Sequence, residues 1–298
     1  MKPIYQGKVR DLYSVDTETF LIVSTNRISA FDVVFNEEIP NKGKTLNSIS
    51  SMWFLYLKNK NSRIFPGFSL EKRLNFKDHF ITNDYKRFPE PYSKEEFKEN
   101  SMLVYKTQKI PFECIVRGYL AGSAWKEYKE TSKISDIPLP KGLELGSPLP
   151  EILFTPSTKE EKGIHDKNIS FKEMENQIGK DLAYRLKEIS VEIYKEASLI
   201  FEEIGFILCD TKFEFGLREN QIYLIDEVLT PDSSRLWKKK DYRIGSNLPS
   251  YDKQLIRDYL ESIQWNKQPP PPPLPQELIQ ETIKRYQEIE ERLKKILT

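Results

Sequence analysis

Hydrophobic and polar residues alternate in several short runs of the chain, and each of these runs predicts a β-strand. Thr19–Thr25 and Ala30–Phe35 are two such runs, with a polar turn predicted at residues 26–29 between them. Met102–Leu120 predicts two more strands that are separated at Pro111, because proline has no N–H to donate to a sheet. We expect this break to form a hinge between two lobes.

Helical periodicity predicts three longer helices. Apolar residues recur at every third or fourth position in Leu46–Lys60 and again in Glu277–Leu297. The third helix is predicted to begin at Ser170, where S-F-K-E fits a capping box, and to end at Gly205. Strand pairs that stand apart from the helices favour an α+β fold over a doubly wound α/β fold.

Two proline-rich segments interrupt these elements. Residues 133–167 predict a long ordered loop, and residues 265–275 predict a stiff polyproline segment before the last helix. With the hinge placed near residue 105, we expect an N-terminal β-rich lobe at residues 1–105. Residues 106–298 would form a C-terminal α+β lobe that carries the substrate and metal site.

Composition narrows the functional classes. The 298 residues include 46 Lys and Arg and 45 Asp and Glu, and the resulting net charge of +1 disfavours nucleic acid as a partner. No apolar run approaches the roughly 18 residues of a membrane span, and the first residues do not form a secretory signal. Cys114 and Cys209 predict two free, buried thiols rather than a disulfide framework or a zinc site. We therefore expect a cytoplasmic protein without membrane partners.

The run L-C-D-T-K-F-E-F-G at residues 208–216 places Asp210, Lys212 and Glu214 on one face of a predicted strand. If this strand forms a hairpin with residues 221–230, Glu214 lies roughly opposite Asp226. Two opposed carboxylates repel unless a cation lies between them, and Mg²⁺ commonly binds one or two carboxylates together with substrate phosphates. The alternative is a solvated hairpin with cross-strand ion pairs, which spacing alone favours.

Three further runs place cations beside glycine or small hydroxyl residues: Lys8 and Arg10 in GKVRD, Arg117 and Ser123 in RGYLAGSAW, and Arg235 in TPDSSRLW. Arginine forks and helix N-termini suit phosphates, although each run taken singly also fits a glycine turn with an exposed base.

Gly43-Lys44-Thr45 is not the end of a P-loop, because the upstream glycine that the motif needs is Glu38. Of the two histidines, His79 is predicted to be structural. His165, in a polar loop, could equally orient a substrate.

Six motifs occur in order along the chain: YQGKVRDLY, NRISAFDVV, ECIVRGYLAGSAWKEY, FTPSTKEEKGIHDKNISF, LCDTKFEFGL and LIDEVLTPDSSRLW. Together with SYDKQLIRDYL at residues 250–260 they closely resemble the SAICAR synthetase family, in its longer form. The chain departs from the family pattern at Thr131–Ser135, where a glycine-containing turn would be expected. This departure affects the loop conformation and not the chemistry.

The resemblance implies a two-lobed SAICAR synthase-like fold with a nucleotide cleft like those of protein kinases and ATP-grasp enzymes. It also implies an ATP-dependent ligase with Mg²⁺. This enzyme would join L-aspartate to the carboxylate of 5-amino-1-(5-phospho-D-ribosyl)imidazole-4-carboxylate through an acyl phosphate. The products would be SAICAR, ADP and phosphate.

The resemblance also implies roles for single residues. Nucleotide contacts would come from Lys8 and Arg10 at the phosphates and from a hinge that includes Val104, Lys106 and Lys109. Mg²⁺ would be held by Glu214 and Asp226, which also count as ATP-binding. Lys212 would lie near the carboxylate that is activated. The chemistry also needs an acceptor for the amine proton, and Asp210, Asp32 or a substrate phosphate oxygen could accept it. The ribonucleotide phosphate would contact Arg117, Ser123 and Arg235. Other substrate contacts would come from Ser29, Asp32, Lys159, Asp166 and Lys253.

Two other functions remain open from the residues alone. A small-molecule kinase would use the same nucleotide site with a hydroxyl as the acceptor, and a non-catalytic nucleotide-binding or scaffold protein would need no acceptor. Intact acids and bases in every motif disfavour the scaffold. We expect a monomer, because the terminal helix would cover a surface that could otherwise serve association.

Overall fold

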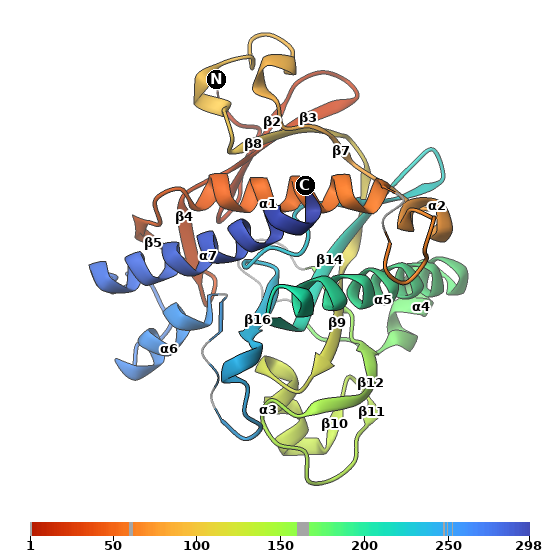
Figure 1. Ribbon diagram of the computed structural model, residues 1–298, viewed down its shortest axis with the longest axis vertical. Coiled ribbons are helices and arrows are strands. Elements are labelled where there is room, and N and C mark those ends of the chain that lie inside the picture. Colours follow the sequence, from red (N-terminus) through yellow and green to blue (C-terminus); the bar gives the residue numbers. More distant parts are fainter. Residues whose placement is uncertain (1, 60–61, 160–166, 247, 249, 252) are drawn as a thin grey trace.

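The computed structural model describes the chain except for residues 1, 60–61, 160–166, 247, 249 and 252. Two main sheets build the molecule, and Figure 1 shows the N-terminal strands above helix α1 and the longer strands β9 and β14 below it. This combination of largely antiparallel sheets and separate helices confirms the predicted α+β class.

The first sheet has five strands in the order β1-β2-β3-β8-β7. Its strands are β1 (Tyr5–Gln6), β2 (Arg10–Ser14), β3 (Thr19–Ser24), β7 (Phe80–Thr82) and β8 (Ser101–Tyr105). A separate hairpin of β4 (Arg27–Ala30) and β5 (Val33–Glu38) extends from it.

The second sheet has seven strands, with the path β12-β9-β14-β15-β6; β13 also pairs with β9, and β16 with β14. Its strands are β6 (Lys77–Asp78), β9 (Gln108–Tyr119), β12 (Pro148–Phe154), β13 (Ser157–Thr158), β14 (Phe206–Arg218), β15 (Gln221–Ile225) and β16 (Ser234–Lys238). A small hairpin of β10 (Lys133–Ile134) and β11 (Ile137–Pro138) lies apart from both sheets.

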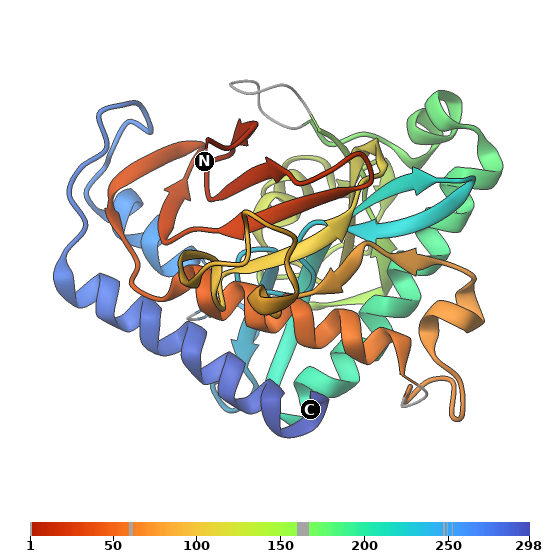
Figure 2. The ribbon, with the colours of Figure 1, turned by 90° about the horizontal axis from the view of Figure 1, so that it is seen from above.

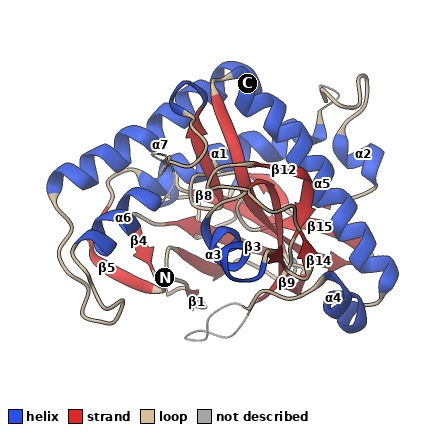
Figure 3. Cartoon of the chain, turned by 90° about the horizontal axis from the view of Figure 1, so that it is seen from below, coloured by secondary structure: helices blue, strands red, loops and turns tan. Residues whose placement is uncertain are grey.

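The helices border the strands, as Figure 3 shows from below. They are α1 (Lys42–Lys58), α2 (Leu70–Leu74), α3 (Gly122–Thr131), α4 (Phe171–Ile178), α5 (Lys180–Glu203), α6 (Gln254–Ser262) and α7 (Gln276–Leu297), with short 3₁₀ turns at Tyr85–Arg87, Glu95–Phe97 and Lys239–Asp241. Helix α1 packs on the first sheet and α5 on the second. Helix α7 lies along α1, which Figure 2 shows from above.

One large apolar core joins the two sheets. Trp53 and Phe54 of α1, Ile193 of α5, and Phe213 and Phe215 of β14 are fully buried members of it. The apolar residues of β14 therefore face α5, and the intervening charged residues face the opposite side of the sheet. Both cysteines are buried and free, as predicted.

Several predicted boundaries are wrong. Residues 27–30 form strand β4 and not the predicted polar turn, and a turn lies instead at Phe31 and Asp32, both with positive φ, inside the second predicted strand. Pro111 lies inside β9, where the register with β14 shifts, and the chain breaks between β8 and β9 instead.

The segment 133–167 is more than a loop, because it contributes β12 and β13 to the second sheet. The capping box at Ser170 is confirmed, although Gly179, with φ 85°, divides the predicted helix into α4 and α5. Gly205 ends α5 with a positive φ, as expected. The division at residue 105 stays a prediction; strand β6 precedes it and yet pairs with β15.

Candidate active site

The floor of the candidate site is formed by two central strands, β9 and β14. Their register pairs Asp210 with Arg117 and Glu214 with Glu113, and Lys212 lies between the two acids of β14. Because side chains on one face recur at every second position, these charged groups all face the same side of the sheet. The alternation predicted for residues 208–216 is thus the alternation of β14.

The prediction that Glu214 lies opposite Asp226 across the hairpin is wrong. The hairpin pairs Glu214 with Ile225, and the acid directly across from Glu214 is Glu113 of β9. Asp226 follows the end of β15 with φ 67°, a left-handed conformation that departs from the alternation of the strand. Its carboxylate nevertheless lines the same cavity as Glu214.

Three lysines neutralise the two opposed glutamates. Lys212 Nζ lies 2.8 Å from Glu113 Oε1, Lys109 Nζ lies 2.8 Å from Glu214 Oε2, and Lys159 pairs with Glu214 as well. Burial alone would raise the pKa of Glu214. The three ammonium groups outweigh burial and hold this pKa below its ordinary value, so that Glu214 is ionised.

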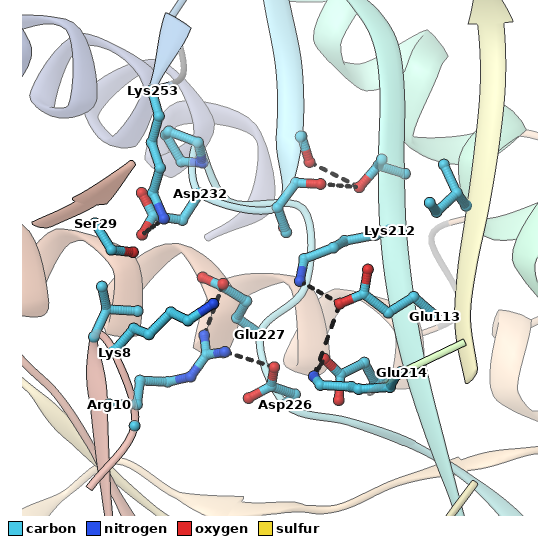
Figure 4. A pocket seen from close by; sticks show the side chains of 18 of the residues that line it. Lys8, Arg10, Ser29, Glu113, Lys212, Glu214, Asp226, Glu227, Asp232 and Lys253 are labelled. Atoms are coloured by element: carbon cyan, nitrogen blue, oxygen red, sulfur yellow. Dashed lines mark hydrogen bonds and ion pairs between the residues drawn. The ribbon is translucent and has the colours of Figure 1, made fainter. Parts of the chain in front are cut away.

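A second group of charges surrounds Arg10. Its guanidinium lies 2.6 Å from Asp226 Oδ2 and 2.7 Å from Glu227 Oε1, and Figure 4 shows this group beside Lys212 and Glu214. Burial is the largest influence on Asp226, and together with the nearby charge of Glu214 it raises the pKa of Asp226 in spite of Arg10.

Two arginines converge on Asp210 at one end of the floor. Arg235 Nη1 lies 2.9 Å from Asp210 Oδ2, and Arg117 Nη1 lies 3.4 Å from the same oxygen. Ser123, in the first turn of α3, accepts a bond of 3.4 Å from Arg117. Gly122 lets the backbone approach closely, since a Cβ there would be 2.5 Å from Arg235 Nη1.

A further charged group lies on the side of β4 and α6. Lys253 Nζ lies 3.0 Å from Asp232 Oδ2, and Ser29 of β4 lines the cavity near them. Lys8 pairs with Asp32 in the turn between β4 and β5.

All of these side chains line one cavity of about 1050 Å³. The predicted site residues that line it are Lys8, Arg10, Ser29, Asp32, Val104, Lys109, Arg117, Ser123, Lys159, Asp210, Lys212, Glu214, Asp226, Arg235 and Lys253. Lys106 does not line it, because its ammonium bonds Ser14 Oγ at 3.0 Å and the carbonyl of Asp16. Asp166 and His165 lie outside the described residues.

Sequence reasoning gave no role to five acids that line this cavity, namely Asp11, Glu113, Glu227, Asp232 and Glu261. Glu113 precedes Arg117 by four positions in a strand, so the period of two would have placed both on one face. His79, predicted to be structural, is buried and also lines the cavity, and burial lowers the pKa of its imidazole to about 3.

Comparison with known proteins identifies the family. The family model described as SAICAR synthetase matches residues 3–272. The chain belongs to the SAICAR synthetase family. The phosphoribosylaminoimidazole-succinocarboxamide synthase of Leptospira interrogans is 48% identical over 292 residues, which cover 98% of this chain and 96% of that protein.

Solved structures of SAICAR synthetases agree with this assignment. The enzyme from Saccharomyces cerevisiae, complexed with SAICAR, superposes with a TM-score of 0.83 at 39% identity, covering 98% of this chain and 94% of that one. A type-2 SAICAR synthetase in complex with ADP gives 0.67 at 25% identity, covering 97% and 96%. The resemblance and the SAICAR synthase-like fold predicted from the motifs are therefore confirmed.

The donor set of this SAICAR synthetase cavity fits Mg²⁺ bound jointly by protein and phosphates. Within the described parts of the chain, no group of three or more His, Cys, Asp or Glu could hold a metal by itself. Glu214 and Asp226 offer two carboxylates toward a cavity that is rich in cations, and Mg²⁺ commonly binds one or two carboxylates plus substrate phosphates.

Proposed function

We propose that this cavity binds ATP, L-aspartate and 5-amino-1-(5-phospho-D-ribosyl)imidazole-4-carboxylate and joins the last two into SAICAR. As a member of the SAICAR synthetase family, the chain is an ATP-dependent carbon–nitrogen ligase of purine biosynthesis, as the sequence predicted. The observation that carries the proposal is the convergence of opposed acids, surplus lysines and an arginine pair on one cavity.

The nucleotide is proposed to lie between the first sheet and the acidic floor. Leu12, Ile22 and Val104 give this part of the cavity apolar side chains suited to a purine ring. Lys8 and Arg10, which line the cavity beside Asp226, supply cations for the phosphates. Glu214 and Asp226 would hold Mg²⁺, which neutralises phosphate charge during phosphoryl transfer.

The ribonucleotide phosphate is proposed to bind at Arg117, Arg235 and Ser123. Guanidinium groups bind phosphate with paired N–H donors, and two of them meet here at one carboxylate. Asp210 pairs with both guanidinium groups, and the two arginines and one aspartate together keep a net positive charge that can bind an anion. The N-terminal turn of α3, which begins beside Ser123, also favours an anion.

The chemistry requires an activated carboxylate, because oxide is too poor a leaving group for an amine to displace. Phosphorylation by ATP gives an acyl phosphate, and the amine of L-aspartate then attacks its carbonyl carbon and releases phosphate. Lys212, which lies on β14 between Asp210 and Glu214, would neutralise the carboxylate during the first step. Asp210 or Asp32 would accept the amine proton, and substrate phosphate oxygen is a third acceptor.

A closed cavity is important for the second step, since water would hydrolyse the acyl phosphate. Lys159 pairs with Glu214 and directly precedes, in the sequence, residues 160–166, which include the predicted contact Asp166. We propose that the ammonium of Lys159 contacts a substrate anion while it remains paired with Glu214.

A monomer in the cytoplasm is the proposed state of the protein. No helix in the described part of the chain has both the length and the apolar character needed to cross a membrane. Helix α7 covers α1 within the same chain and so occupies a surface that could otherwise serve association. Light scattering at micromolar concentration tests this proposal, and a mass near twice 35.1 kDa would contradict it.

Coupled ADP release tests the function directly. With Mg²⁺ present, we expect rapid ADP release only when ATP, L-aspartate and the imidazole ribonucleotide are all supplied. Each substrate is omitted in turn as a control. Release that requires a hydroxyl compound in place of the ribonucleotide would instead support the small-molecule kinase.

A further inference from the structure

The C-terminal helix reaches the active site through one side chain. Helix α7 lies beyond residues 3–272, the region that the family model matches. Tyr286 on this helix is 1% exposed, and its hydroxyl donates to Asp232 Oδ1 over 2.7 Å. Tyr286 is not among the residues that line the cavity, whereas Asp232 is.

The other oxygen of Asp232 holds two lysines. Asp232 Oδ2 lies 2.8 Å from Lys42 Nζ, at the start of α1, and 3.0 Å from Lys253 Nζ, just before α6. The side chains of Asp232 and Lys42 are completely buried, while that of Lys253 is 13% exposed and faces the cavity. Asp232 is therefore fixed from behind by α1 and α7, and it in turn fixes Lys253.

An apolar cluster gives α7 a second connection to the same wall of the cavity. Ile279 of α7 belongs to one buried apolar cluster with Ile256 and Leu260 of α6 and with Ile28 and Phe35 of the β4–β5 hairpin. This hairpin carries Ser29 and Asp32, and α6 directly follows Lys253. Helix α7 thus lies behind the wall that presents these side chains.

We propose that Tyr286 is a positioning residue that holds Asp232 in place and, through it, aims the ammonium of Lys253 at a substrate carboxylate. This inference rests on the proposed function and assigns it a residue on a helix outside the region matched by the family model. Both L-aspartate and the imidazole ribonucleotide carry a carboxylate, so the ligand chemistry is shared and the test must separate the two sources.

The physical reason is the need for accurate placement of a buried charge. An ionised carboxylate in a dry site is held by its donors, and it accepts from Tyr286 on one oxygen and from lysines on the other. Without the phenol, Asp232 can rotate about its χ angles and Lys253 moves with it. A displacement of about 1 Å in a binding group is enough to weaken a site substantially.

The experiment compares Tyr286→Phe with Ile289→Val, a packing change at a buried position about one turn further along α7 that removes no hydrogen-bonding group. We expect Tyr286→Phe to raise the KM for L-aspartate or for the ribonucleotide by roughly tenfold, the scale of a lost hydrogen bond to a charged group. The KM for ATP should stay within about twofold, and Ile289→Val should leave all three constants near those of the unmodified protein.

A double variant tests whether the effect passes through Lys253. If it does, Tyr286→Phe added to Lys253→Met should change the affected KM by less than about twofold, because coupled residues are not additive. Unchanged constants in Tyr286→Phe, equal changes in Ile289→Val, or a full additional effect in the double variant would each overturn the inference. Failure of the unmodified protein to release ADP with all three substrates would overturn the proposed function instead.

Discussion

Glu113 and Glu214 on the cavity floor can be compared with Glu71 and Asp78, a second pair of neighbouring acids at the edge of the same sheet. Three lysines form ion pairs with Glu113 and Glu214, and these lysines also line the cavity. Among the described residues, Asp78 has one ion-pair partner, Lys58 at 2.8 Å, and its N–H donates to Glu71 over 3.1 Å.

The repulsion between the two acids is relieved in a different way in each pair. Burial and the nearby Asp78 raise the pKa of Glu71 to about 8, so that one proton is retained between the two acids near neutral pH. Lysines instead hold the pKa of Glu214 below its ordinary value, and Glu214 stays charged. Neighbouring acids therefore indicate a ligand site when their cations also face open space, and a closed structural contact when a proton joins them.

The largest expected effect comes from removing a floor acid. Glu214→Ala should lower the turnover number about 100-fold or more, because it removes a proposed Mg²⁺ ligand and leaves surplus lysines in its place. The measurement is ADP release with saturating substrates and Mg²⁺.

Glu71→Gln is the matched control for that experiment. It alters the other acid pair without touching the cavity, so its turnover number should equal that of the unmodified protein. If Glu214→Ala retained normal turnover, the metal role of the floor, and with it the functional side of the comparison, would be wrong.

The arginine pair extends the comparison to a third acid, Asp210. Arg235→Ala should raise the KM for the ribonucleotide by roughly tenfold or more with a smaller change in turnover number, because a charge-assisted fork to the phosphate is lost. Arg235→Lys should recover only part of the affinity, since a single ammonium lacks the paired donors. An unchanged KM in Arg235→Ala would reject the phosphate role.

A smaller effect is expected where the backbone approaches this pair. Gly122→Ala places a Cβ 2.5 Å from Arg235 Nη1, so the guanidinium must shift, and we expect a KM for the ribonucleotide raised about fivefold. Gly142→Ala is the control, because Gly142 also has a positive φ but has no atom within 4 Å of the added Cβ. Equal constants in the two variants would mean that backbone strain, not Arg235, governs the result.

Local patterns made part of this site predictable. The period of two identified Asp210, Lys212 and Glu214 as one face of a strand, and the capping box identified the start of α4 at Ser170. Both signals arise within a few consecutive residues, where strand alternation and end-capping chemistry act directly. The six motifs identified the resemblance to the family, and this resemblance assigned residues from separate motifs to one site.

Contacts between distant segments could not be predicted in the same way. The register that places Glu113 opposite Glu214 depends on how β9 meets β14 across about 100 positions of sequence, and an irregularity near Pro111 shifts it. The contact of Lys42 with Asp232 spans 190 positions, and neither residue shows an unusual local pattern. Such contacts depend on packing of whole elements, which spacing along the chain does not encode.

The last prediction concerns the pair of Glu71 and Asp78 and the way in which the stability of the protein depends on pH. Because the pKa of Glu71 is raised from 4.5 to about 8, the folded state binds more protons than the unfolded state between these pH values. The stabilising contribution is therefore complete below about pH 4.5 and is lost as the pH rises toward 8. Glu71→Gln cannot lose a proton, so its Tm should fall less than that of the unmodified protein between about pH 5 and pH 8.5, by several degrees. Scanning calorimetry measures both proteins in the same buffers, where all other titrating groups are shared. Identical pH profiles would show that Glu71 carries no extra proton, and the two acid pairs would then differ only in their exposure to the cavity.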